Sequence, residues 1–343
     1  QRFGRSFGVV LSPLFRGSIC VPTRFASKQP EPRIMVTGGC GQVGVALVEQ
    51  LRTEFGSDNV LSTDIVKPRA SEYSKGPFAY ANVLEEKQIE RLVVEHRIDW
   101  VVHNSSMLSA VAEKNHLAAF DLNFIGMKNM LEVSRRHGLR IFSPSSIAAF
   151  GIDTPLDNVP DLTVQRPSTL YGVSKVYAEL LGEYYFHKFG VDFRSLRYPG
   201  IISASPPGGG TTDYAVDIFF SGLRSGKYEC FLRDDSMLPM MYMPDCIKAT
   251  IDILRAPSKT LKQRTYNIAA CSFTPKELTA ELQKHIPHLE VTYAPDFRQK
   301  IADTWPKRLD DTNARKDWGW KEEFNLEAMT ADMVIKVKEL LAQ

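Results

Sequence analysis

Short apolar segments alternate with amphipathic segments along the first two thirds of the chain. The apolar segments, which have the pattern of strands buried on both faces, lie at 33–37, 60–64, 99–103, 140–146 and 191–199. The segments with helical spacing of apolar residues lie at 43–55, 85–96 and 115–137, and a further helix is expected around Tyr171. Buried strands separated by helices predict an α/β fold, with a doubly wound parallel sheet covered on both faces.

The regular alternation ends at "SASPPGGGTTDY" (203–214), a segment rich in Pro, Gly and Ser. Such a composition is typical of a boundary between two lobes. We therefore predict a nucleotide-binding domain over 31–205 and a smaller, mixed C-terminal substrate lobe over 206–343, with room for some segments to interleave. Further helices are expected at 214–224, 275–285 and 325–341, with a strand at 264–269.

Composition and charge exclude several classes of protein. Hydrophobic residues make up 43% of the chain and charged residues 24%, as in soluble globular proteins. No apolar run reaches the length of about eighteen residues that a membrane span needs, so we expect no membrane insertion. The net charge is only +2, and the cations of residues 1–30 account for it, so the charge gives no reason to expect nucleic-acid binding.

Residues 1–30 contain five Arg or Lys residues and no acid, together with Ser and scattered apolar residues. This composition is typical of a mitochondrial transit peptide and predicts a protein of the mitochondrial matrix; the alternative is a disordered tail or residues derived from a vector. The five cysteines include no C-x-x-C pair, so neither a disulfide framework nor a zinc site is predicted, and we expect no metal.

The segment "VTGGCGQVG" (36–44) joins the first strand to the first helix. Glycines at this junction allow a tight turn and a close approach to a pyrophosphate, and the start of the helix supplies free N–H groups. The predicted cofactor-binding residues of the turn are Gly38, Gly41, Gln42, Val43 and Gly44. Asp64 ends the second strand twenty residues after Gly44, where an acid accepts ribose hydroxyls and repels a 2′-phosphate. The pattern indicates a Rossmann-type domain that binds NAD rather than NADP.

Two further segments carry candidate chemistry. In "RPSTLYGVSKVYAE" (166–179), Tyr171 and Lys175 are four residues apart and share a helix face, a spacing that also occurs by chance. In "FSPSSIAAFG" (142–151), Ser145 and Ser146 follow a strand, where hydroxyls either face a ligand crevice or only cap a turn.

Together these motifs resemble the extended short-chain dehydrogenase/reductase family, in which a serine or threonine precedes Tyr-x-x-x-Lys by about twenty-five residues. Ser146 precedes Tyr171 by twenty-five. The resemblance implies that Ser146, Tyr171 and Lys175 are catalytic, with Ser145 as the substitute for Ser146. It also implies that the cofactor is held by Asn82, Val83, Asn123, Tyr171, Lys175, Pro199 and Ile201.

A closer resemblance is to the L-threonine dehydrogenases of the short-chain type, carried by the segments 195–203, 208–219, 238–247 and 301–306. It implies oxidation of the C3 hydroxyl of L-threonine to a ketone with formation of NADH. Tyr171 would act as the base, with its pKa lowered by Lys175 and by the nicotinamide charge. A homodimer formed through the long helices 115–137 and 170–189, and a downstream 2-amino-3-oxobutanoate CoA ligase, are further implications.

The ammonium and carboxylate of the substrate also need partners. Besides Ser146 and Tyr171, the candidates are Ser109 and Thr212, with Thr211 and Trp305 as weaker ones. The glycines 208–210 predict a segment that closes over the substrate. The sequence also allows two alternatives, an epimerase or reductase of nucleotide-sugars with the same fold and a non-catalytic NAD-binding protein.

Overall fold

The computed structural model describes residues 31–69, 75–206, 208 and 210–342. The predicted transit peptide therefore lies outside the described residues. The described residues from Pro32 onward form one compact unit. No helix in the described part of the chain is long and apolar enough to cross a membrane.

The large sheet confirms the predicted parallel fold. Its strands run in the order β11-β7-β5-β4-β1-β2-β3, β6 pairs with β7, and every pairing is parallel. The strands are β1 Ile34–Thr37, β2 Val60–Asp64, β3 Phe78–Tyr80, β4 Trp100–His103, β5 Arg140–Phe142, β6 Ser145–Ser146, β7 Asp192–Tyr198 and β11 Thr265–Asn267. The strand order reverses between β1 and β4, which is the point where such a sheet opens a crevice for a dinucleotide.

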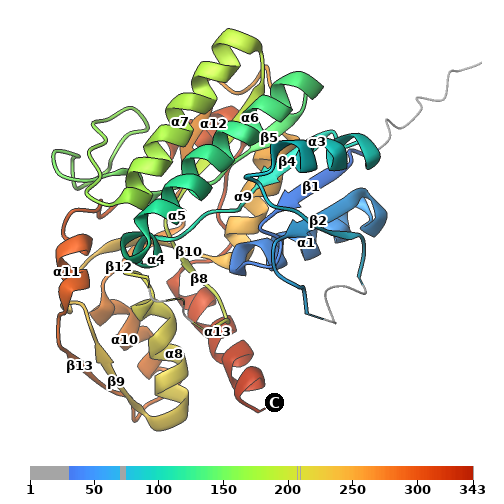
Figure 1. Ribbon diagram of the computed structural model, residues 1–343. Coiled ribbons are helices and arrows are strands. Elements are labelled where there is room, and N and C mark those ends of the chain that lie inside the picture. The colour runs from blue at the N-terminus through green and yellow to red at the C-terminus, as the bar shows by residue number, and fades with distance from the viewer. Residues whose placement is uncertain (1–30, 70–74, 207, 209, 343) are drawn as a thin grey trace, which may run out of the picture. The chain divides into compact units, whose positions relative to one another are not determined.

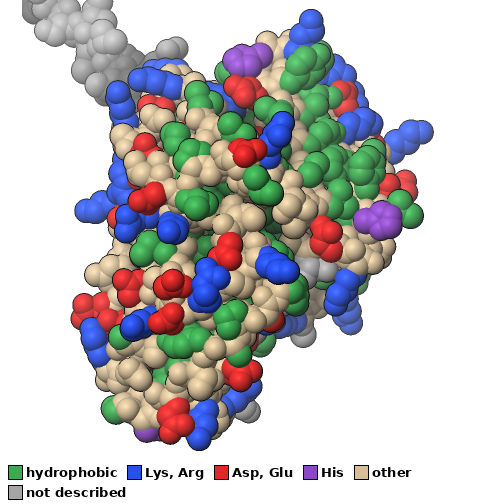
Figure 2. Space-filling view, turned by 90° about the vertical axis from the view of Figure 1, so that its left-hand side faces the viewer, with side chains coloured by type: hydrophobic (Ala, Val, Ile, Leu, Met, Phe, Trp, Pro, Cys, Tyr) green, Lys and Arg blue, Asp and Glu red, His purple; other side chains and the backbone are tan. Residues whose placement is uncertain are grey.

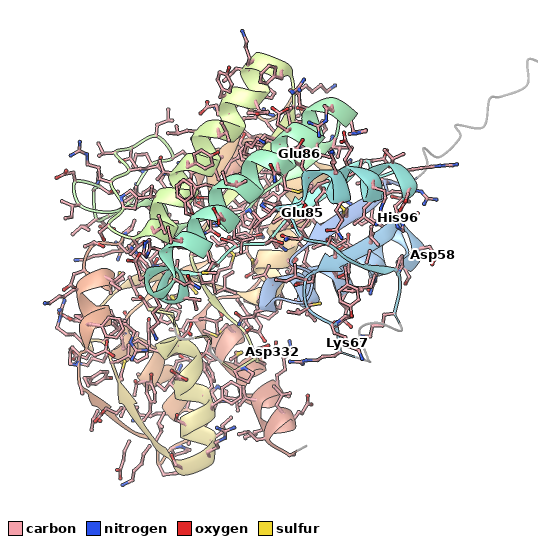
Figure 3. The ribbon with its side chains drawn as sticks, in the orientation of Figure 1. Asp58, Lys67, Glu85, Glu86, His96 and Asp332 are labelled. Carbon is pink, nitrogen blue, oxygen red and sulfur yellow. The ribbon has the colours of Figure 1, made fainter. Side chains whose placement is uncertain are left out.

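Two hydrophobic cores lie on opposite faces of this sheet. Neighbouring residues of a strand point to opposite faces, so Ile34 and Val36 join one core while Met35 joins the other. The first core includes α1 (Gln42–Phe55) and α9 (Met243–Arg255). The second includes α3 (Glu86–Glu95), α6 (Gly126–His137) and α7 (Leu170–Phe189), which lie together in Figure 1. Glu86, labelled in Figure 3, links α3 to α6 through Arg136 at 2.8 Å.

The predicted helix 115–137 is interrupted by a wider turn. It consists of α5 (His116–Phe120), a π-helical turn at Asp121–Ile125, and α6. The π turn holds Asn123, whose carboxamide accepts a hydrogen bond from Met107 N at 2.8 Å and donates one to Met107 O at 3.1 Å. The extra residue thus places an amide where it binds the loop after β4.

The remaining elements form a smaller mixed region with its own core, seen in the lower part of Figure 1. Its strands are β8 Gly200–Ile202, β10 Leu238–Tyr242 and β12 Cys271–Phe273 in one sheet, and β9 Lys227–Cys230 and β13 Glu290–Tyr293 in another. Its helices are α8 Tyr214–Ser225, α10 Pro275–Gln283 and α13 Leu326–Leu341, with α11 Phe297–Ala302 as a short connecting helix. Two more short helices belong to the larger region: α4 Ser109–Lys114 packs against α7, and α12 Thr312–Trp318 packs against β11. Although α9 and β11 follow residue 205, they belong to the large sheet and its core, so the two regions interleave.

Candidate active site

A cavity of about 460 Å³ opens at the carboxyl edge of the large sheet. It lies between the glycine turn, the segment after β4, β6, α7 and residues 208 and 210–213. It gathers residues that lie far apart in the sequence. The predicted site residues in its wall are Gln42, Val43, Ser109, Ser146, Tyr171, Lys175, Pro199, Ile201 and Thr212, together with Ser145, Thr211 and Trp305.

The centre of the cavity is formed by a serine, a tyrosine and a lysine. Thr169 caps α7 by accepting a hydrogen bond from Gly172 N at 3.1 Å, and the helix then presents Tyr171 and Lys175 on one face. The hydroxyl of Ser146 faces the phenol of Tyr171 and acts as a hydrogen-bond partner that lowers its pKa. The ammonium nitrogen of Lys175 lies 5.1 Å from the centre of the Tyr171 ring and donates to Pro144 O at 2.9 Å.

The two adjacent serines have different partners. The Ser145 hydroxyl is buried and donates to the carboxylate of Glu179, whereas the Ser146 hydroxyl meets Tyr171 and accepts from Ala148 N at 3.2 Å. Neighbouring strand residues point to opposite sides, so only one of the pair can face the phenol. The geometry therefore favours Ser146 over Ser145 as the hydroxyl that meets a substrate.

Burial changes the protonation behaviour of the central groups. It lowers the pKa of Lys175 to about 8, although Glu179 opposes the change. Burial also raises the pKa of Tyr171 to about 12, against the opposing effect of the Ser146 hydrogen bond. The expectation that Lys175 lowers the pKa of Tyr171 is thus not met by the protein alone. Burial, followed by the charge of Lys175, lowers the pKa of His103 to about 3, so this imidazole beside Thr37 is neutral.

The glycine turn leaves room for a ligand because side chains are excluded from it. Gly38 has a φ of +68°, and a Cβ there would lie 2.8 Å from Ser105 N. A Cβ on Gly44 would lie 2.1 Å from Gly38 O, so α1 can pack this closely only with glycine at that position. Gly41 precedes the first turn of α1, whose free N–H groups begin at Gln42 and Val43. This cradle fits a pyrophosphate.

Asp64 is fixed beside the glycine turn at the end of β2. Its carboxylate accepts from Cys40 N at 3.0 Å, Ile65 N at 2.7 Å and Val66 N at 3.2 Å. A carboxylate has about four acceptor positions, so one remains for a ribose hydroxyl. The negative charge next to the cradle suits NAD and opposes a 2′-phosphate.

Seven predicted cofactor residues are not in the wall of this cavity. Gly38, Gly41, Gly44 and Asp64 belong to the glycine turn and to the end of β2, and the other three lie elsewhere. Asn82 and Val83 follow β3, two strands away from the glycine turn, where Asn82 accepts from Leu84 N at 3.0 Å and Val83 is buried. Asn123 is buried, and its carboxamide forms hydrogen bonds with Met107, Ser106 and Ser174. Its place is behind the wall, where it holds the loop that carries the wall residues.

The cavity also contains polar residues that the sequence did not single out. Asp213 is the one carboxylate in the described wall, and its side chain accepts from Gly210 N at 2.7 Å. Asp213 follows Thr212 directly in the segment 208–219, so the motif that pointed to Thr212 could also have pointed to Asp213. Asn104 also lines the wall, and neither atom of its buried carboxamide has a hydrogen-bond partner among the described residues. No pattern in the sequence marks Asn104.

The residues of the cavity and the glycine turn are suited to proton and hydride transfer from an alcohol. A phenol hydrogen-bonded to a hydroxyl and next to an ammonium group can take the proton of a substrate alcohol. The dinucleotide cradle at the same edge of the sheet supplies the place for a hydride acceptor. In the described part of the chain no cluster of His, Cys, Asp or Glu is arranged to hold a metal ion. The arrangement is suited to interconverting an alcohol and a ketone.

Known proteins are similar to this chain in sequence and fold. The profile of the NAD dependent epimerase/dehydratase family matches residues 34–269. The chain is 53% identical over 310 residues to the mitochondrial L-threonine 3-dehydrogenase of Bos taurus, covering 90% of this chain and 83% of that relative. The solved L-threonine dehydrogenase of Phytophthora infestans is 51% identical with a TM-score of 0.87, covering 90% of this chain and 99% of that one. The GalE-like L-threonine dehydrogenase of Cupriavidus necator in its holo form is 43% identical with a TM-score of 0.87, covering 89% and 100% of the two chains.

Proposed function

This chain belongs to the NAD dependent epimerase/dehydratase family and, within it, to the L-threonine 3-dehydrogenases, and from that membership we propose that it oxidises L-threonine with NAD. It is an NAD-dependent oxidoreductase that acts on a CH–OH group. The C3 hydroxyl of threonine becomes a ketone, which gives 2-amino-3-oxobutanoate and NADH.

The main structural support for threonine oxidation is the cluster of Ser146, Tyr171 and Lys175 in the cavity. In our proposal the Ser146 hydroxyl donates to the substrate oxygen and holds it against the phenol of Tyr171. Tyr171 takes the hydroxyl proton, and Lys175 favours the phenolate by its charge. Bound NAD supplies the acceptor for the hydride that leaves C3.

The raised pKa of Tyr171 has a consequence for this role. A phenol with a pKa near 12 is neutral at pH 8, so the protein's own groups keep the base protonated. A second positive charge close to the phenol, that of the nicotinamide ring of NAD, is needed to favour the phenolate. Tyr171 is therefore a base that becomes effective when cofactor and substrate are together in the cavity.

Substrate contacts are proposed from the charge and position of the wall residues. Asp213 offers the one carboxylate in the described wall for the substrate ammonium, while Ser109 and Thr212 offer hydroxyls to the substrate carboxylate. Thr211 and Trp305 complete this part of the wall. Gly208 and Gly210 belong to the same segment, and we propose that it closes over the bound amino acid.

The decisive experiment follows NADH formation at 340 nm with L-threonine, L-serine and a panel of UDP-sugars. We expect rapid NADH formation with threonine and much less with serine, because serine lacks the C4 methyl group. Turnover of a UDP-sugar with no reaction of threonine would identify a nucleotide-sugar epimerase or reductase instead. NAD binding without turnover of any compound would identify a non-catalytic NAD-binding protein.

We also propose that the protein works in the mitochondrial matrix. The acid-free, Arg-rich segment 1–30 and the mitochondrial name of the Bos taurus relative support this location. The β-keto acid product is prone to lose its carboxyl group, so a 2-amino-3-oxobutanoate CoA ligase is a fitting consumer. Import of a fluorescent fusion, compared with a fusion that lacks residues 1–30, tests the location.

A homodimer is the proposed assembly. Hydrophobic side chains on α5, the π turn and α7 are exposed, among them Leu117, Phe120, Ile125, Val173, Leu180 and Tyr184. Figure 2 shows hydrophobic side chains gathered on the upper right of the face that it presents. An apolar surface of this kind suits a second copy of the chain. Light scattering should report a dimer for the wild type, a monomer for Leu180→Glu, and a dimer for the control Leu340→Glu on α13.

A further inference from the structure

Asn104 is a polar residue in an unusual position. Its main-chain N–H donates to Thr37 O at 3.1 Å, which joins the carboxyl ends of β4 and β1. The residue lines the catalytic cavity, and both polar atoms of its carboxamide are shielded from solvent without a hydrogen-bond partner among the described residues. A primary amide has two donor hydrogens and a carbonyl acceptor, so leaving all of them unpaired is costly.

The contrast with other asparagines shows that the fold satisfies such groups elsewhere. The Asn129 amide donates to Val83 O at 3.1 Å, and the Asn59 amide donates to Phe55 O at 2.7 Å. Asn104 differs because it stands at the wall of a cavity rather than against other backbone. The missing hydrogen-bond partner is therefore expected from a molecule that enters the cavity.

The strand order identifies which part of that molecule meets Asn104. Along the edge of the sheet, Asp64 ends β2, the glycine turn follows β1, Asn104 follows β4, and Ser146 ends β6 beyond β5. NAD presents its parts in the same order: adenosine ribose, diphosphate, nicotinamide ribose and nicotinamide. The main chain of Asn104 lies beside the glycine turn, because a Cβ on Gly38 would be 3.0 Å from the main-chain carbonyl carbon of Asn104.

We infer that the Asn104 carboxamide hydrogen-bonds the nicotinamide-side ribose of NAD and thereby positions the cofactor between the glycine turn and Ser146. The inference rests on the proposed NAD-dependent function and adds a residue to it. Asn104 is a positioning residue, since it is not needed for the proton or hydride transfer itself. In the complex, a ribose hydroxyl supplies the hydrogen-bond partner that the Asn104 carboxamide otherwise lacks among the described residues.

The test compares binding of ADP, ADP-ribose and NAD to the full-length protein by calorimetry. Asn104→Leu keeps the size of the side chain and removes its hydrogen bonds. We expect the Kd of ADP-ribose and of NAD to rise about tenfold, while the Kd of ADP, which has no second ribose, stays unchanged. Asn104→Ala serves as a second variant and should show the same selectivity.

Melting of the cofactor-free protein gives an independent readout. Removing an unpaired buried amide should leave the Tm of Asn104→Leu unchanged or higher, whereas Asn59→Leu, which loses a made hydrogen bond, should lower it. An equal loss of ADP affinity would overturn the ribose assignment, and so would unchanged ADP-ribose affinity or a lower Tm for Asn104→Leu. Because ADP-ribose binding requires no turnover, failure of this inference and failure of the threonine oxidation are distinguishable.

Discussion

Two buried polar clusters lie back to back beside α7, and they are organised in opposite ways. In the first, Arg197 forms a double hydrogen bond with Glu179 at 2.9 and 2.7 Å, and Glu179 also accepts from Ser145 and Gln165. In the second, Ser146, Tyr171 and Lys175 meet at the cavity. The two clusters share the Ser145–Ser146 pair and are one helical turn apart at Lys175 and Glu179.

The difference lies in how the charges are balanced. The Arg197 cluster pairs its charges within itself, and such a pair is a rigid part of the scaffold. The Lys175 cation has a backbone carbonyl as its hydrogen-bond partner, and burial holds its pKa near 8. Buried charge that is only partly compensated can respond to a ligand, which is what a catalytic site requires.

The largest effect should follow from the loss of the Tyr171 phenol. Tyr171→Phe removes the base and the hydrogen bond to Ser146, so kcat should fall about 10³- to 10⁴-fold. Calorimetry should find little change in NAD affinity, because the ring and Lys175 remain. A loss of NAD affinity comparable to the loss of kcat would show that Tyr171 mainly shapes the cofactor site.

Glu179→Gln tests the scaffold cluster. It leaves Arg197 buried without its counter-charge, and the free energy of unfolding should fall by roughly 3–5 kcal/mol. Urea unfolding followed by circular dichroism measures this. The control is Glu290→Gln in the exposed Lys227–Glu290 pair, where a change below about 1 kcal/mol is expected. Equal effects at the two positions would show that the buried Arg197–Glu179 pair contributes no more to stability than an exposed pair.

The pH dependence of stability should reveal Lys175. Its folded pKa of about 8 lies below the ordinary value of 10.5, so the unfolded chain binds this proton more tightly. Between about pH 8 and 10.5, Lys175 is already deprotonated in the folded state but still protonated in the unfolded chain. The free energy of unfolding therefore rises with pH across this window. Relative to Lys175→Met, the cofactor-free wild type should gain up to about 3 kcal/mol across this window. Parallel pH profiles of stability for the two proteins would mean that the pKa of Lys175 is not lowered in the folded state.

The smallest and sharpest test uses the two adjacent serines. Ser146→Ala should lower kcat about 10²-fold with little change in stability, because its hydroxyl faces the phenol. Ser145→Ala should lower stability by about 1–2 kcal/mol and leave kcat near the wild-type value, because its partner is Glu179. Steady-state kinetics and urea unfolding of both variants measure the pair. The reverse result would exchange the roles of the two clusters.

The sequence by itself determined the parallel sheet and the residues of the central site. Strands buried on both faces have an unmistakable continuous apolar pattern, and 33–37 and 60–64 became β1 and β2 nearly to the residue. The glycine turn and the Ser146–Tyr171 spacing are local features with a direct physical meaning. No apolar segment was predicted at β3, because this edge strand is partly exposed and lacks the continuous apolar pattern of a strand buried on both faces.

Tertiary structure alone decided the rest. The π turn at Asn123 and the roles of Ser145 and Ser146 depend on partners 16 to 34 residues away. The chain's return to the large sheet through α9 and β11 depends on a core that spans both regions. Asn104 stands out only once the fold shows that its amide has no hydrogen-bond partner among the described residues. Local propensity acts over a few residues, whereas burial and hydrogen-bond satisfaction are properties of the assembled chain.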